Sequence, residues 1–380
     1  ADWGRHVAQA AELSLQVLSL AYPDAGPWTF DTTRVIAVGV SNGGGAVLRA
    51  GELDGPHFDA VVAVSPNILP GDGGRPLYDY ASDAAIWMPC ALNARAFDAV
   101  PLARPGGASS TAGFARCASL RAAGLVDADE SAAQAEAARR QLLAGGWTDE
   151  AIAAGALSSN FDLWRAVNAT YASAYARTGP DAMPCGFSFT ALDASGQPRA
   201  PTAAERAAWW SDGSGIPPGN GIGLIDPQFA GADPTYPGLR CLRALATGRD
   251  GMAAQVQQGV AGTRASAPAN GVPVVVIHGL DDGLVPAAFT SAPYVAMSRA
   301  AGRDVRHWQV RRAQHFDAFL ALPDYRSRYV PLLPYVFAAL DRVQAHLDGG
   351  APLPADALIE PTPRPLGTAL DAASLALPLR

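Results

Sequence analysis

Lysine is absent from this 380-residue chain, and charged residues of any kind make up only 17% of it. All 28 basic residues are arginines, and they are outnumbered by 35 aspartates and glutamates, which leaves a formal net charge of −7. No run of arginines interrupts this acidic balance. Nucleic-acid binding requires a concentrated basic surface, so the composition predicts no nucleic-acid partner.

Long apolar runs are also missing. No stretch approaches the ~20 apolar residues of a membrane-spanning helix, and we expect no membrane partner. Hydrophobic residues nevertheless make up 49% of the chain, which is enough for a sizeable core and argues against a disordered protein.

Cysteine is scarce, with only Cys90, Cys117, Cys185 and Cys241. None of them has the C-x-x-C spacing of a zinc or redox site, so we predict no metal. An exported protein would join four cysteines in one or two disulfides, by any of three pairings. We therefore expect a secreted or periplasmic protein; four reduced thiols in a cytoplasmic enzyme are the alternative.

Short β-branched runs alternate with helical patterns in the two outer parts of the chain. This alternation predicts a mainly parallel sheet with helices on both faces. The expected strands are 33–40, 58–64, 272–277 and 305–310, and the clearest expected helices are 2–20 and 332–347.

The segment Gly39-Val40-Ser41-Asn42-Gly43 fits the pattern G-x-S-x-G between an expected strand and an expected helix. Such a turn strains the serine backbone, so small residues are expected two positions before and after it, at Gly39 and Gly43. It would lift the Ser41 hydroxyl out at the edge of the sheet. The backbone N–H of Asn42 would then stabilise a developing oxyanion.

A nucleophilic serine needs a base and an acid, which follow it in the order Asp, His in this kind of fold. The segment Asp282-Gly283-Leu284-Val285-Pro286 follows a strand and favours Asp282 as the acid, with Asp281 as the alternative. His315 follows the strand that ends at Val310 and is the expected base.

Two further polar residues lie near this expected triad. His278 ends the strand before the acid and is expected to pack or form a hydrogen bond rather than to line the pocket. Asp317 follows the base closely and is expected in a loop or at a helix cap.

Together these patterns predict an α/β-hydrolase fold, a mainly parallel sheet with a large, mostly helical lid insertion. We expect four regions: the nucleophile part of the core, the lid, the acid and base part of the core, and a Pro-rich extended tail. Their expected bounds are 1–85, 86–262, 263–348 and 349–380.

Aromatic and other large apolar side chains are concentrated in the expected lid. They would either line an acyl-binding wall or, more simply, form the lid's own core; they are Trp87, Met88, Trp164, Tyr171, Tyr175, Phe187, Phe189, Trp209 and Trp210. Cations that could hold an anionic substrate end are Arg165, Arg177, Arg240 and Arg243, and the sequence does not choose among them.

With these residues placed, four segments of the chain resemble the bacterial D-3-hydroxybutyrate oligomer hydrolases. They are 36–46, 58–67, 274–286 and 313–317. The resemblance implies hydrolysis of soluble 3-hydroxybutyrate oligomers to monomers, downstream of a polyester depolymerase and without a cofactor. By motif match it assigns the nucleophile to Ser41, the acid to Asp282 and the base to His315.

Family members are longer than this chain, which begins at the helix before the nucleophile strand. The strands expected upstream, and the loop that supplies a second oxyanion N–H, are not in it. A sheet built from the strands seen here would leave an apolar edge uncovered. We therefore expect an N-terminal segment or a companion chain beside strand 33–40.

Two other functions fit the same motifs. A tannase-like or feruloyl-type esterase also has a large lid over a Ser-Asp-His site. A non-catalytic binding subunit would keep the fold after losing half of its oxyanion hole. The expected partner of the protein is in each case a small-molecule ester.

Overall fold

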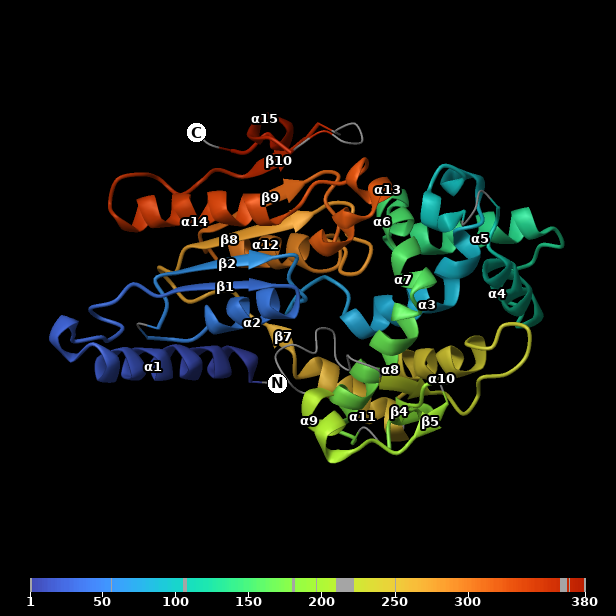
Figure 1. Ribbon diagram of the computed structural model, residues 1–380. Coiled ribbons are helices and arrows are strands. Elements are labelled where there is room, and N and C mark those ends of the chain that lie inside the picture. The colour runs from blue at the N-terminus through green and yellow to red at the C-terminus, as the bar shows by residue number, and fades with distance from the viewer. Residues whose placement is uncertain are drawn as a thin grey trace.

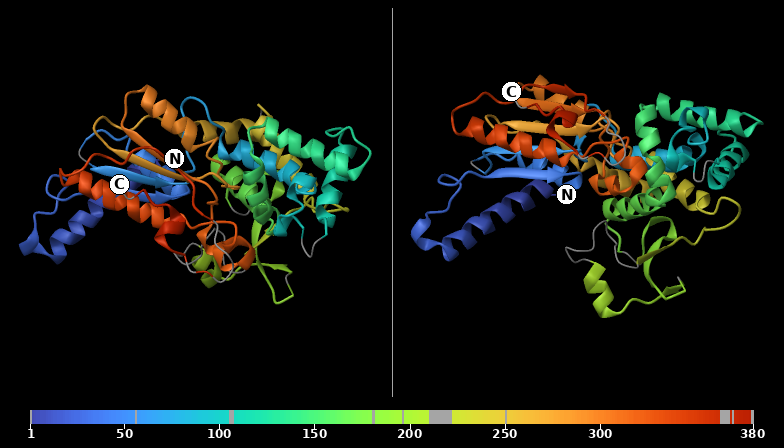
Figure 2. Two further views of the ribbon diagram at one scale, coloured as in Figure 1. Left: turned by 90° about the horizontal axis from the view of Figure 1, so that it is seen from above. Right: turned by 45° about the horizontal axis from the view of Figure 1, so that its top comes forward.

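The computed structural model describes residues 2–55, 57–104, 108–179, 182–195, 197–209, 222–249, 251–362, 368 and 370–378. A parallel sheet with helices on both faces forms one half of the molecule (Figure 1). A mostly helical part forms the other half and lies beyond the carboxyl ends of the strands, as the views in Figure 2 also show. Among these residues no helix is both long and apolar enough to cross a membrane.

The central sheet has five strands in the order β1-β2-β8-β9-β10, and all of its pairings are parallel. The strands are β1 (Ile36–Val40), β2 (Ala60–Val64), β8 (Val274–Gly279), β9 (Val305–Val310) and β10 (Ala357–Ile359). The mainly parallel sheet predicted from the sequence is confirmed. The first, second and third predicted strands begin two or three residues later than expected.

Both faces of the sheet are covered by helices, because successive side chains of a strand point to opposite faces. Val61 and Ala63 pack in one apolar cluster with α1 (Trp3–Ala21), α2 (Asn42–Ala50) and α12 (Ser291–Ala300). Ala60, Val62 and Val64 pack in another cluster, with α14 (Leu333–Leu347).

The C-terminal region differs from its prediction as an extended tail. Residues 357–359 form β10, which pairs with β9 and adds a fifth strand to the sheet. Trp308 of β9 reinforces this pairing, because its indole N–H donates to the carbonyl of Ala355 at 3.0 Å. A short helix, α15 (Ala372–Leu375), follows and places the buried Leu375 in the cluster of α14.

Strand β1 is the other edge of the sheet. Within the described residues it pairs only with β2, so every other strand of the sheet lies on one side of it. Val38 and Val40 are 42% and 45% exposed, whereas β2 and β8 are fully buried. This edge therefore presents apolar side chains and free backbone groups to solvent.

The helical part lies between β2 and β8 in the chain and has its own apolar core. We call residues 77–261 the helical segment. Its helices are α3 (Leu77–Ala91), α4 (Thr111–Ala122), α5 (Ser131–Ala144), α6 (Asp149–Ala154), α7 (Ala156–Asn160), α8 (Leu163–Ala176), α9 (Ala203–Trp209), α10 (Tyr236–Thr247) and α11 (Gly251–Ala261). The boundary expected at residue 85 falls inside α3, whose apolar side chains belong to this core from Leu77 onward.

Two small sheets accompany the helical segment, and a short helix lies between β9 and α14 in the chain. One small sheet is antiparallel, with strands β4 (Ser188–Leu192), β5 (Pro198–Arg199) and β6 (Ile222–Ile225). The other pairs β3 (Leu69–Pro70) with β7 (Arg264–Ala265) where the segment leaves and rejoins the core. Helix α13 (Pro323–Arg326) precedes α14.

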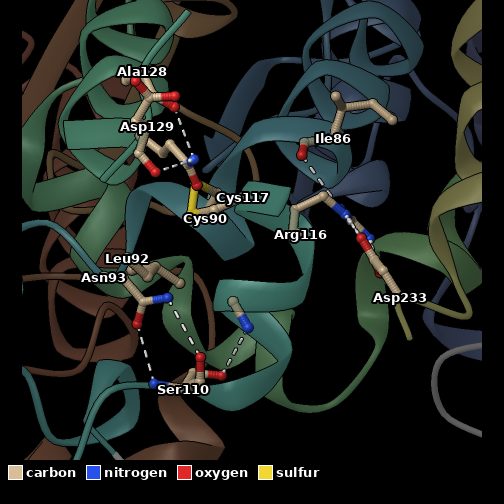
Figure 3. The surroundings of a disulfide bond; sticks show 12 residues. Ile86, Cys90, Leu92, Asn93, Ser110, Arg116, Cys117, Ala128, Asp129 and Asp233 are labelled. Carbon is tan, nitrogen blue, oxygen red and sulfur yellow. Dashed lines mark hydrogen bonds and ion pairs between the residues drawn. A yellow bond between two sulfur atoms is a disulfide. The ribbon is translucent and has the colours of Figure 1, made fainter. Parts of the chain in front are cut away.

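Two disulfides, Cys90–Cys117 and Cys185–Cys241, connect elements of the helical segment. The first joins α3 to α4 (Figure 3). Beside it the buried Arg116 donates to the carboxylate of Asp233 from two nitrogens, at 2.6 and 3.2 Å. Both disulfides form among the four cysteines, which indicates an oxidising environment.

Candidate active site

Ser41 lies in the sharp turn between the end of β1 and the start of α2. Its φ of +56° and ψ of −117° are strained for a residue with a side chain. The backbone holds this conformation through three hydrogen bonds. The Ser41 N–H donates to the Val64 carbonyl at 2.8 Å, and the Ser41 carbonyl accepts from the N–H groups of Gly45 and Asn67 at 3.0 and 2.9 Å.

The glycines around Ser41 are not equivalent. A Cβ at Gly39 would lie 2.2 Å from the carbonyl oxygen of Gly43, so Gly39 must lack a side chain. A Cβ at Gly43 would meet nothing within 4 Å, and the requirement predicted there is wrong. The tightest position after the serine is Gly45, where a Cβ would lie 2.1 Å from the carbonyl oxygen of Asn67.

Gly39→Ala is therefore expected to destabilise the turn, and Gly43→Ala is its matched control. The clash at Gly39 is with backbone, which cannot move aside without displacing α2. We expect a loss of about 1–3 kcal/mol or more in the free energy of unfolding, together with loss of any Ser41-dependent activity. Gly43→Ala should change the free energy of unfolding by less than about 0.5 kcal/mol. Urea unfolding of both variants checks this, and equal effects would contradict the clash.

His315 and Asp282 come from loops after β9 and β8, and both side chains meet Ser41 at the carboxyl edge of the sheet. The Nε2 atom of His315 lies 2.9 Å from the Oγ of Ser41. Its Nδ1 atom lies 2.7 Å from the Oδ2 of Asp282. The structure thus places the three predicted residues in one hydrogen-bonded chain.

Asp282 is fully buried and is held by its own loop. Its Oδ1 accepts the N–H groups of Leu284 and Val285 at 2.9 and 2.7 Å. Burial alone would raise the pKa of this carboxyl, but the neighbouring His315 and His278 outweigh burial and hold the pKa well below its usual range. Asp282 is therefore ionised at neutral pH and can stabilise a protonated His315.

His278 lies behind this acid, on β8, and is buried. Its Nε2 atom is 2.8 Å from the carbonyl oxygen of Val285 and 3.5 Å from the Oδ2 of Asp282. With Nε2 protonated, His278 donates to the acid loop and does not line the cleft. The hydrogen-bonding role favoured by the sequence is the one that the structure shows.

Asp281, the alternative acid, faces away from the base. Its Oδ1 accepts the N–H of Arg312 at 3.2 Å, and burial raises the pKa of its carboxyl to about 6. Asp317 accepts the N–H groups of Leu332 and Leu333 at 2.9–3.0 Å and so caps the start of α14. Only Asp282 is placed to orient His315.

Asn42 connects the turn to the helical segment, a link that the sequence analysis missed. Its Oδ1 accepts from the hydroxyl of Tyr171 on α8 at 2.7 Å and from the Nδ2 of Asn67 at 2.8 Å. Tyr171 and Asn67 are far from Asn42 in sequence, and no local pattern signals the contact. These bonds fix the first residue of α2, whose backbone N–H is the predicted oxyanion donor.

A cleft of about 270 Å³ opens over Ser41 and His315, and we call it the Ser41 cleft. One stripe of α8 forms its wall at helical spacing, with Leu163, Ala166, Val167, Thr170, Tyr171 and Ala174. The rest of the apolar lining is Trp3, Leu77, Leu284, Val285 and Phe316. The cleft can receive an uncharged, partly apolar acyl chain beside the serine.

Most of the large apolar residues noted in the sequence do not line this cleft. Trp87, Met88, Trp164 and Phe187 are buried in the core of the helical segment, and Tyr175 and Phe189 pack against it. Trp209 ends α9, and Trp210 lies outside the described residues. Tyr171 is the residue of that set that lines the Ser41 cleft.

Comparison with known proteins gives related sequences and a solved structure with weaker similarity. D-(-)-3-hydroxybutyrate oligomer hydrolases of Paracidovorax citrulli and Polaromonas naphthalenivorans are 36% and 34% identical to this chain, over 416 and 413 residues. Each match covers 96% of this chain and 58% of the relative, so the chain spans less than two thirds of their length. A solved esterase from Aspergillus oryzae is 16% identical, with 92% of this chain and 64% of that chain covered. Its TM-score of 0.38 is too low to assign a fold.

A family model describes this group directly. The model of the 3HB-oligomer hydrolases matches residues 1–378. The match therefore covers the β1–α2 turn, the helical segment and the acid and base loops together. The chain belongs to the 3HB-oligomer hydrolase family.

Proposed function

We propose that this chain carries the catalytic centre of a serine esterase that hydrolyses soluble D-3-hydroxybutyrate oligomers to monomers. The observation that carries the proposal is the hydrogen-bonded chain from Ser41 through His315 to the buried, ionised Asp282. Membership of the 3HB-oligomer hydrolase family supports the choice of substrate. The Ser41 cleft supports it further, because its wall is apolar.

The proposed reaction passes through an acyl-enzyme. Ser41 Oγ attacks the ester carbonyl while His315 Nε2 takes its proton, and Asp282 stabilises the imidazolium. The backbone N–H of Asn42 stabilises the oxyanion. As the C–O bond breaks, His315 gives the proton to the leaving alkoxide, which departs as an alcohol. Water then attacks the acyl-enzyme with His315 as base, which frees the acid and restores Ser41.

In this proposal the chain has an α/β-hydrolase fold with a lid. The helical segment is inserted between two neighbouring strands and lies beyond the carboxyl ends of the sheet (Figure 1). Ser41 follows the carboxyl end of β1. The Tyr171–Asn42 hydrogen bond ties it to the nucleophile turn. A lid in this place would cover the acyl chain and restrict water around the reacting ester.

We also propose a secreted or periplasmic location and a role in the degradation of poly-3-hydroxybutyrate. Two disulfides among the described residues support an oxidising compartment. A polymer too large to be imported must be cut outside the cytoplasm, and short oligomers are the product of that cut. An esterase for soluble oligomers would act directly after it.

The exposed edge of β1 supports a further part of the proposal, a polypeptide that packs beside this strand. A hydrolase sheet has strands on both sides of the nucleophile strand, and a second oxyanion N–H comes from an upstream loop. The relatives extend well beyond the length that this chain matches. We propose that a preceding segment of the same protein, or a tightly bound companion chain, supplies both.

Residues 1–380 produced alone are accordingly expected to be a poor enzyme and to associate. Loss of one oxyanion donor costs about 10²–10³-fold in kcat at comparable sites. The uncovered apolar edge of β1 favours association. Activity and light scattering of this chain, measured with and without the proposed preceding segment or companion chain, check both expectations. A soluble monomer of residues 1–380 that is as active as the completed protein would contradict the proposed partner.

The substrate is tested by incubating the natural full-length protein with 3-hydroxybutyrate dimers and trimers, and separately with galloyl and feruloyl esters. We expect 3-hydroxybutyrate as the product of the first pair, detected by mass spectrometry, and far slower turnover of the aromatic esters. Faster turnover of the aromatic esters would favour a tannase-like or feruloyl-type esterase. Absence of turnover on all four would favour a non-catalytic binding subunit.

A further inference from the structure

A second cleft continues from the Ser41 cleft along α8. It has a volume of about 200 Å³, and we call it the Arg177 cleft. Trp3, Leu77, Tyr171 and Ala174 line both clefts, so the two share a wall. The residues that line the Arg177 cleft include two arginines and no acidic residue. The apolar path that starts at the serine therefore leads to a positively charged region.

Arg177 ends the stripe of α8 that faces both clefts. It follows Ala174 by three residues, which keeps it on the same side of the helix as the cleft wall. It lies six residues after Tyr171, about 9 Å along the helix axis. Tyr171 marks the nucleophile end, because its hydroxyl bonds to Asn42. Arg177 therefore lies less than two helical turns beyond the residue that contacts the nucleophile turn.

Charge pairing separates Arg177 from the other cations noted in the sequence. Arg165 pairs with Asp162 and Asp226, and Arg243 pairs with Asp79 and Asp83. Arg240 stacks on Tyr236 and is not among the residues that line either cleft.

The two arginines that line the Arg177 cleft also differ in their charge pairing. Arg49 pairs with Glu52 at 3.2 Å and also donates to the carbonyl of Arg264. In the part of the chain that the structure describes, the guanidinium of Arg177 has neither an ion pair nor a hydrogen bond. It is the cation of the cleft that remains available to a ligand.

Arg177 also marks the end of α8. Arg177 is the C-cap of α8 and has a φ of +57°, in the left-handed region that glycine adopts most easily at helix ends.

We propose that Arg177 binds the terminal carboxylate of an oligoester on the leaving-group side of the scissile bond. The inference rests on the proposed function and names its substrate more closely, as a chain that ends in a free acid. In an oligomer of a hydroxy acid, the acyl group transferred to Ser41 lies toward the hydroxyl end. The alcohol that leaves carries the carboxyl end. The Arg177 cleft would hold that leaving portion, with two N–H groups of the guanidinium on the carboxylate.

The test compares two substrates in the natural full-length protein, the 3-hydroxybutyrate trimer with a free carboxylate and its methyl ester. Wild-type protein should favour the free acid. Arg177→Gln should lower kcat/KM for the acid by about 10- to 100-fold, mainly through KM, and leave the methyl ester unchanged. Arg177→Lys should retain part of the preference, because it keeps the charge but loses the bidentate geometry. Arg240→Gln is the matched control and should change neither substrate.

The outcomes separate this inference from the proposed function. Equal loss on both substrates, or no loss on either, would overturn the role of Arg177 and leave the esterase intact. Wild-type protein that cleaves p-nitrophenyl butyrate but neither trimer would overturn the proposed substrate, and the role of Arg177 with it. The inference is supported if wild-type protein prefers the free-acid trimer to its methyl ester and only the Arg177 variants lose this preference.

Discussion

Ser41→Ala is expected to lower kcat for ester hydrolysis by at least about three orders of magnitude while the fold stays intact. The hydroxyl is the nucleophile in the proposed reaction, and it lies in the cleft at 2.9 Å from the Nε2 of His315. The fold does not depend on the Ser41 side chain, because the turn is held by backbone hydrogen bonds to Val64, Gly45 and Asn67. Steady-state kinetics with the trimer and urea unfolding measure the two effects separately.

Ser65→Ala provides the matched control for this variant. Ser65 follows the neighbouring strand β2, is buried and also has a positive φ, of 38°. Its Oγ has no hydrogen-bond partner among the described residues and so forms no hydrogen bond with His315. The control should therefore remain active. Near-normal turnover by Ser41→Ala, or an equal loss in Ser65→Ala, would refute Ser41 as the nucleophile.

Asp282→Asn is expected to lower kcat by about 10⁴-fold, as at a comparable triad, whereas Asp281→Asn should have little effect on kcat. Asp282 accepts from His315 Nδ1 and sets which ring nitrogen faces Ser41. An asparagine amide there can donate to Nδ1, which places the remaining proton on Nε2 and removes the base. In the described structure the carboxylate of Asp281 accepts a hydrogen bond from the backbone of Arg312 and none from His315. A larger kcat loss in Asp281→Asn would reverse the assignment.

The same pair of variants has a pH signature in stability. Burial raises the pKa of Asp281 from 3.8 to about 6, so folding disfavours its ionised form. Wild-type protein therefore loses stability relative to Asp281→Asn as pH rises from about 4 through about 6. Urea unfolding of both proteins across this range checks the sign. A constant difference in the free energy of unfolding would mean that Asp281 does not titrate there.

The sequence predicted the elements with strong local patterns. Each run of buried β-branched residues became a strand, and the order Ser, Asp, His placed the three polar residues that the structure brings together. The resemblance to the 3-hydroxybutyrate oligomer hydrolases is confirmed by the family match. The catalytic roles themselves stay predictions until the variants above are measured.

The elements that were missed depend on distant contacts. Strand β10 has only three residues and lies in a proline-rich region. Its pairing with β9 is what makes it a strand. The four cysteines allowed three pairings, and the packing of α3 against α4 decides which forms. The Tyr171–Asn42 bond joins residues 129 positions apart, and the role of Gly45 depends on where the Asn67 carbonyl lies. None of these leaves a local signal.

Reaction of the natural full-length protein with a fluorophosphonate, followed by peptide mapping, tests the central claim most directly. The triad geometry predicts a single modification on the peptide that contains Ser41, with trimer hydrolysis falling in proportion to the label. Asp282→Asn should react far more slowly, because its His315 cannot activate the serine. Label on a different serine, or full hydrolysis by completely labelled protein, would contradict the account.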